Sequence, residues 1–419
     1  MKRLYLGIAL TTLLGWPSLL AAQTYVIRNA RIVTVSGPVI PSGNILIQDG
    51  KIAAVGANIS IPSGAKVVDA KGLTAYPGMI DAHTSVGLEE IDSINATLDT
   101  AEMGDLNPHM KASAAINPLS EHVAVTRTNG ITSVLSTPSG GLFSGQGALI
   151  GLDGWVTKDM MIKDAAVMVI NYPREPNAAA NTTEQQRRNG EDERKRRVDL
   201  LKKTLREAQA FAKLVESRPD EAAPNVMLRA LIPVVKGEQP VMFNVDKASE
   251  IRGAIEIADE FKLKAILSGC AEAWKVVDLL KSKNVPVLLG GTLSLPGGEY
   301  EPYDVNYTTA SVLSKNGVKF AFTTNDAAHV RDLPFEAGVA VAYGLSKEEA
   351  LKAVTLYPAQ ILGVDKQIGS IAEGKNANII LTDGDPLEKL TKVKHLFING
   401  KPVELKNKHT ELYEIFSKR

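Results

Sequence analysis

Residues 76–85 read YPGMIDAHTS, and this stretch decides the fold. A short apolar run ends in Asp81, His83 and Ser85, which stand at every second position. Alternate residues of a β-strand point to the same face. The pattern therefore predicts a buried strand that brings a carboxylate, an imidazole and a hydroxyl together at its carboxyl end.

The segment 77–358 alternates apolar runs with helical stretches. Six further runs are typical of buried strands: GITSVLST, AAVMVIN, PVMFNV, KAILSG, VPVLLGG and VKFAFTTND. Strand–helix alternation over this length favours a parallel sheet or barrel. A (β/α)8 TIM barrel needs eight strands. One strand is therefore missed by the pattern or lies within residues 103–130.

Both chain ends contain short β-strand patterns. Residues 23–76 include the hairpin ILIQ-DG-KIAAV, and residues 359–419 include HLFINGKPVEL, with Asp-Gly and Asn-Gly as the turns. We expect one composite β-sandwich formed by both ends, around the barrel of residues 77–358. Residues 184–221 are densely charged, and one apolar stripe predicts a helix that covers the barrel from outside: Val198, Leu201, Leu205, Ala208, Ala212 and Val215.

Composition argues against a nucleic-acid partner and excludes an intrachain disulfide. The chain of 419 residues carries 47 Lys+Arg and 47 Asp+Glu, so net charge gives no support to a nucleic-acid partner. Aromatic residues make up 5%, which argues against a base-stacking surface. Cys270 is the only cysteine, so no intrachain disulfide can form.

Residues 1–22 have the pattern of a secretory signal peptide. Lys2 and Arg3 precede an apolar run, and Ala21 and Ala22 form a small-residue exit. Cleavage after Ala22 predicts a secreted protein, periplasmic if the host is Gram-negative, with no membrane contact afterwards. An uncleaved membrane anchor is the alternative.

The first strand and the C-terminal part of the chain resemble one family. YPGMIDAHTS is similar to the PG-x-I-D-x-H-x-H signature of the amidohydrolase superfamily. Residues 344–388, GLSKEEALKAVTLYPAQILGVDKQIGSIAEGKNANIILTDGDPLE, resemble its C-terminal block. MGDLNPHMKASAAINP and GGLFSGQGALI resemble its imidazolonepropionase/prolidase-like branch. The resemblance covers nearly the whole mature chain and implies a metal-centred barrel, a composite sandwich and a small-molecule substrate.

The resemblance also implies five ligand positions for a divalent metal such as zinc. The first histidine is His83, and the aspartate of the last strand is Asp326, which would bind metal and take the proton from the attacking water. Ser85, Asn244 and Gly269 occupy the other three positions, so the metal-ligand set is degenerate. Ser85 and Asn244 are then expected to face substrate.

Several side chains offer alternatives. Gln146 lies in a glycine-rich run and could reach a ligand. A Ser85–His83–Asp326 triad is disfavoured because Ser85 and His83 share one strand. Lys236 is expected in the last turn of a helix, with Gly237 as its stop, and not at a metal. A rearranged metal site could draw on other residues, each of which also has a purely structural explanation: Asp81, His109, Asp246, Cys270 and His329.

Two functions are consistent with this sequence. The favoured one is a hydrolase of carbon–nitrogen bonds, non-peptide or in small peptides, in which His83 and Asp326 anchor a single or rearranged metal. The alternative is a catalytically degenerate binding or structural protein that keeps the barrel mouth. Either protein could form a homo-oligomer.

Overall fold

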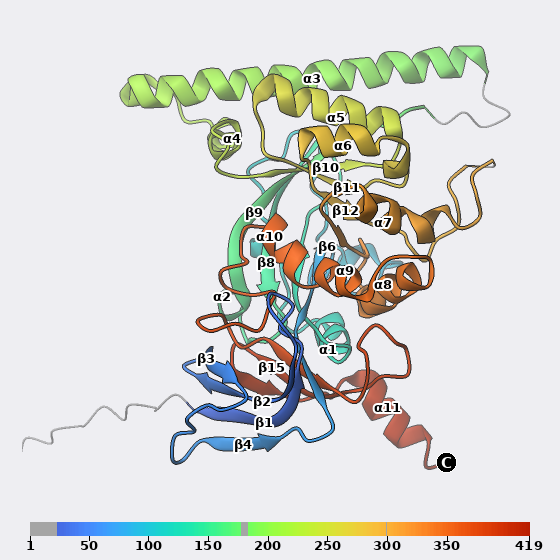
Figure 1. The fold of residues 1–419 in the computed structure, drawn as a ribbon. Coiled ribbons are helices and arrows are strands. Elements are labelled where there is room, and N and C mark those ends of the chain that lie inside the picture. Colours follow the sequence, from blue (N-terminus) through green and yellow to red (C-terminus); the bar gives the residue numbers. More distant parts are fainter. Residues whose placement is uncertain (1–22, 177–182, 299) are drawn as a thin grey trace, which may run out of the picture.

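The computed structural model describes residues 23–176, 183–298 and 300–419 (Figure 1). The expected signal peptide lies outside these ranges. Within them, no helix combines the length and the apolar character needed to cross a membrane. Two eight-stranded sheets organise the chain, one in its middle and one built from its two ends.

The middle sheet has the strand order β13-β12-β11-β10-β9-β8-β7-β6 and nearly closes into a TIM-barrel-like structure. The backbone N–H of Asn325 donates to the carbonyl of His83 at 2.9 Å, which links the two outermost strands. Phe143, Phe243 and Phe320 are fully buried in its core. Its strands are β6 (Met79–Thr84), β7 (Ile131–Ser136), β8 (Phe143–Gly151), β9 (Met161–Asn171), β10 (Val241–Val245), β11 (Ala265–Gly269), β12 (Val287–Leu289) and β13 (Phe320–Phe322).

The eighth barrel strand is β8, and it does not lie within residues 103–130. It runs antiparallel to β7 and β9, whereas the other neighbouring pairs of this sheet are parallel. Its sequence FSGQGALIG is glycine-rich, and Gly145 has a φ of +132°. The glycines interrupt the apolar pattern and shift the register, so the strand resembles a turn in sequence.

The strands of both chain ends join in the second sheet, because β5 pairs with β14. The two predicted hairpins are present: Asp49-Gly50 and Asn399-Gly400 adopt positive φ angles between paired strands. A sandwich of two packed sheets stays a prediction. The strands are β1 (Tyr25–Ile32), β2 (Ile40–Gln48), β3 (Lys51–Gly56), β4 (Lys66–Asp69), β5 (Thr74–Pro77), β14 (Ile379–Thr382), β15 (Val393–Ile398) and β16 (Lys401–Val403).

Helices surround the barrel, and the charged segment forms the longest of them, α3. It begins at a capping box made by Thr183 and Gln186, and lies across the outside of α4 and α5 in Figure 1. Leu201, Leu205 and Ala208 of the predicted stripe are buried, which confirms a covering helix. The helices are α1 (Glu121–Arg127), α2 (Thr157–Met160), α3 (Glu184–Ser217), α4 (Val226–Val235), α5 (Ala248–Phe261), α6 (Val277–Lys283), α7 (Val305–Lys315), α8 (Leu333–Ala342), α9 (Lys347–Ala353), α10 (Leu356–Ile361) and α11 (Lys408–Phe416).

Candidate functional site

His83 lies near the carboxyl end of β6 and reaches across the barrel interior. Its Nδ1 lies 2.7 Å from Oγ of Ser268, on the non-adjacent strand β11. The residue is 6% exposed, and burial lowers the pKa of His83 to about 4. The ring is therefore neutral at pH 7, and Nε2 is the nitrogen left to face a ligand.

Asp81 is completely buried behind His83 and accepts several hydrogen bonds. The hydroxyl of Thr323 donates to Oδ1 at 2.6 Å, and that of Thr324 donates to Oδ2 at 2.7 Å. The backbone N–H of His83 donates to Oδ1 of Asp81 at 3.2 Å, so Asp81 helps to hold the His83 segment. Burial raises the pKa of Asp81 to about 6, although these hydrogen bonds oppose the shift.

Asp326 follows β13 and is close to β6 through the backbone. Its carbonyl accepts a hydrogen bond from the N–H of Ser85 at 3.1 Å. The carboxylate is engaged by His329, whose N–H donates at 2.9 Å to Oδ1 and whose Nδ1 lies 3.2 Å from Oδ2. Burial raises the pKa of Asp326, but these contacts with His329 outweigh it and leave the pKa below its ordinary value. The side chains of His83 and Asp326 thus have separate partners.

The residues expected to face substrate are held by local contacts. Ser85 Oγ donates to Glu89 at 3.0 Å, and Gln146 Nε2 donates to the carbonyl of Pro108 at 3.0 Å. On β10, Asn244 Nδ2 donates to Asn171 Oδ1 at 2.7 Å. The Oδ1 atom of Asn244 is buried and has no hydrogen-bond partner among the described residues.

The other metal-ligand candidates do not form a cluster. Asp246 follows β10 and lies 3.6 Å from a guanidinium nitrogen of Arg174. Cys270 is fully buried, and burial followed by the charge of Asp246 raises the pKa of its thiol, so it stays protonated. Lys236 follows α4, precedes Gly237 at φ +71°, and pairs with Glu216. It occupies the helix end that the sequence predicts.

These donors do not fit the metal centre implied by the sequence. Among the described residues, no group of three or more His, Cys, Asp or Glu side chains is placed to hold an ion. A catalytic zinc needs about three protein ligands. His83 Nε2 could supply one, but the Asp326 carboxylate is bound to His329, and Ser85 and Asn244 have other partners.

Several buried polar atoms without a described hydrogen-bond partner belong to segments that follow the barrel strands in the chain. Among the described residues, eight buried side-chain polar atoms lack a hydrogen-bond partner. Five of them belong to residues near or beyond the carboxyl end of a barrel strand. These are His109 after β6, Asn244 in β10, Trp274 after β11, Thr292 after β12 and Glu336 after β13. Buried polar groups are rarely left unpaired unless a water, ion or ligand satisfies them. Water or a polar ligand beside these segments would satisfy such atoms.

Thr292 and Glu336 were missed by the sequence analysis. Thr292 is 1% exposed and Glu336 is 7% exposed. Burial, then the charges of Asp81 and Asp332, raise the pKa of Glu336 to about 8, while the backbone N–H of Thr292 lowers it. A single acid within the apolar helix sequence LPFEAGVAVA is a signal that could have found Glu336. Nothing in the local sequence distinguishes Thr292.

The fold and its polar mouth define a TIM-barrel-like α/β protein, a class whose sites lie at the carboxyl ends of the strands. The amidohydrolase family description matches residues 305–403. The amidohydrolase tasK of Hapsidospora irregularis is 23% identical over 379 residues, covering 82% of this chain and 38% of that protein. The chain thus spans less than half of that relative's length.

Other similar proteins match along more of their length. Imidazolonepropionase of Mesorhizobium japonicum is 24% identical over 390 residues, covering 85% of this chain and 91% of that protein. A crystal structure of an amidohydrolase from Thermotoga maritima has a TM-score of 0.80 at 26% identity, covering 91% of this chain and 99% of the other. The chain belongs to the amidohydrolase superfamily. Members of this family typically bind divalent metals such as zinc.

Proposed function

We propose that this protein binds a small polar molecule at the mouth of the barrel without the divalent-metal centre typical of its family. One observation carries the proposal: five unpartnered, buried polar atoms belong to segments at that end of the barrel. Asn244 Oδ1 offers an acceptor and Thr292 offers a hydroxyl. Glu336, protonated below about pH 8, offers a donor. The ligand should therefore carry both hydrogen-bond donors and acceptors.

Hydrolysis of a carbon–nitrogen bond is the second candidate. Two observations favour it: an aspartate, Asp326, still follows the last barrel strand, and the relatives include proteins named adenine deaminase and imidazolonepropionase. In this case His83 and Asp326 would anchor one ion after Asp326 exchanged His329 for the metal. Under either function, the pattern of residues 1–22 supports a role after export.

Metal content separates the two candidates. The protein purified as residues 23–419 should hold far less than one equivalent of zinc, manganese, iron or nickel by elemental analysis. Incubation with added metal should not convert hydantoins, N-acyl amino acids or dipeptides to products. Near-stoichiometric metal that is lost in His83→Ala, together with turnover, would reject the binding proposal and support the hydrolase.

A ligand screen tests the binding proposal directly. Small polar compounds that raise the melting temperature should be recovered chemically unchanged. Thr292→Val should abolish that shift, because it removes a hydroxyl at the mouth. Ser133→Ala is the matched control, since Ser133 Oγ is also buried and unpartnered but lies within β7. Removing an unpartnered hydroxyl should cost little stability. For compounds without a carboxylate group, a melting-temperature shift that survives Thr292→Val, or disappears equally in Ser133→Ala, would contradict the assignment of this site.

A further inference from the structure

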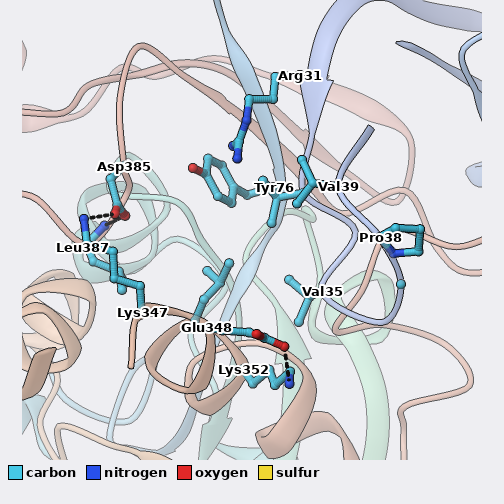
Figure 2. Close-up of a pocket in the computed structure, with 13 residues that line it drawn as sticks. Arg31, Val35, Pro38, Val39, Tyr76, Lys347, Glu348, Lys352, Asp385 and Leu387 are labelled. Carbon is cyan, nitrogen blue, oxygen red and sulfur yellow. Dashed lines mark hydrogen bonds and ion pairs between the residues drawn. The ribbon is translucent and has the colours of Figure 1, made fainter. Parts of the chain in front are cut away.

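A cavity lies where the sheet of the two chain ends meets helix α9, and Figure 2 shows its lining. Its volume is about 500 Å³. Tyr76 forms one wall of the cavity and lies three residues before the start of β6. The cavity is therefore near the amino-terminal end of that strand, whereas the mouth of the barrel is at the carboxyl ends. Boundaries between structural units are frequent positions for small-molecule sites.

One positive charge in this cavity is not neutralised by an ion pair. Lys347 Nζ lies 3.1 Å from Asp385, and Lys352 Nζ lies 2.7 Å from Glu348. Arg31, on β1, forms no ion pair with the described acidic side chains. Figure 2 shows its guanidinium group directed toward the ring of Tyr76. The acids of the cavity are thus paired with lysines, and a guanidinium group remains for an anion.

Tyr76 supplies a hydroxyl beside this guanidinium group. The residue is 8% exposed, and its ring forms part of the cavity wall. Burial and then the charge of Asp385 raise the pKa of Tyr76, and together they outweigh the lowering effect of Arg31, so the phenol stays protonated and can donate a hydrogen bond. Guanidinium and phenol groups together can bind the two oxygens of one carboxylate.

The remaining wall is aliphatic and includes a strained residue. Val35 has a φ of +67°, which is rare for a β-branched residue. Such strained positions persist where the surrounding structure holds them, and they are frequent at ligand sites. The apolar lining is formed by Val33, Val35, Val39, Leu351 and Leu387. This wall suits a short aliphatic chain.

We propose that this cavity binds a small aliphatic monocarboxylate, with its carboxylate on Arg31 and Tyr76 and its chain against the valines of the β1–β2 connection. The site is independent of the function proposed for the barrel mouth. Because Arg31 and Tyr76 belong to the sheet and Leu351 belongs to α9, a bound carboxylate should also fasten the sheet to the barrel. It should therefore raise the melting temperature.

Hexanoate is the probe for this site, and titration calorimetry on residues 23–419 is the measurement. Hexanoate should bind saturably, whereas hexylamine and inorganic phosphate should not, because one lacks the anion and the other lacks the aliphatic chain. Arg31→Met should weaken hexanoate binding by roughly tenfold or more. Tyr76→Phe should weaken it by a smaller factor.

Arg28→Met is the matched control, because Arg28 is an exposed arginine of the same strand outside the cavity lining. It should bind hexanoate as the unmodified protein does, and so should Thr292→Val at the mouth. The melting temperature of each unliganded variant shows whether it has folded. Absence of saturable binding, equal binding by Arg31→Met, or loss of binding in Thr292→Val would overturn the proposal. Phosphate binding as strong as hexanoate binding would also overturn it, since the site would then be a general anion site.

Discussion

Replacing Glu336 with glutamine should remove a large part of the pH dependence of folding stability. Glu336 lies on α8 with 7% of its surface exposed, and its Oε2 has no described partner. Burial is the largest cause that raises the pKa of Glu336 from 4.5 to about 8, and the charges of Asp81 and Asp332 add to it. The folded protein therefore keeps this carboxyl group protonated at pH values where the unfolded chain ionises it.

The sign of the effect follows from proton binding. Between about pH 4.5 and 8, the folded state binds more protons at Glu336 than the unfolded state does, so stability falls as the pH rises. With these two pKa values, the loss between pH 5 and pH 7 is about 2.5 kcal/mol, at 1.36 kcal/mol for each pKa unit. Glutamine has nearly the same shape and no proton to release, so this contribution should vanish in Glu336→Gln.

Equilibrium urea unfolding at pH 5, 6, 7 and 8 measures this difference. The quantity of interest is the decrease in unfolding free energy of the unmodified protein from pH 5 to pH 7, minus the same decrease in Glu336→Gln. In this double difference, the free-energy contributions of the titrating groups that both proteins share cancel. We expect about 2.5 kcal/mol. A double difference near zero would mean that Glu336 is ionised in the folded protein, and the burial account would be wrong.

Three further changes test other parts of the structure, each by urea unfolding at pH 7. Val35→Asn should raise the unfolding free energy by about 1 kcal/mol, because asparagine tolerates a positive φ better than valine. A decrease would show that the packing of the valine side chain stabilises the fold by more than its backbone strain destabilises it. Ser268→Ala should lower it by about 1–2 kcal/mol, since His83 Nδ1 loses its partner at 2.7 Å; no change would contradict this contact. Gly78→Ala should lower it by about 1–3 kcal/mol, because a Cβ there would stand 2.2 Å from Thr132 Cγ2. An unchanged urea midpoint in Gly78→Ala would show that β7 can move to make room for the new Cβ.

Local patterns were enough to find most of the fold. The apolar runs marked seven of the eight barrel strands, and the Asp49-Gly50 and Asn399-Gly400 turns marked both hairpins. The eighth strand escaped because β8 contains glycines that break the apolar pattern. Its antiparallel direction was also beyond local patterns, since direction depends on which strands become neighbours in space.

The site was predictable only where it depends on local spacing. His83 and Asp326 lie close to the ends of neighbouring barrel strands, as the alternation in YPGMIDAHTS and the position of TTND indicated. The partner of His83 is 185 residues away in sequence, and Asp81 is held by threonines more than 240 residues away. Such contacts arise from barrel closure, and no local pattern encodes them. The separate partners of His83 and Asp326 could be recognised only from the coordinates.

The three positions at which the family resemblance implies a replaced ligand, Ser85, Asn244 and Gly269, differ in backbone conformation. At Ser85 and Asn244 a different side chain occupies an ordinary backbone position. Gly269 has a φ of +92°, and a Cβ there would stand 2.5 Å from Asp246 Oδ1 and 2.9 Å from the carbonyl of Val245. A histidine at this position would need a positive φ and the displacement of Asp246. A side chain at position 269 would therefore require a change in the backbone or in Asp246 at the end of β11, which agrees with the proposal of a mouth without the divalent-metal centre.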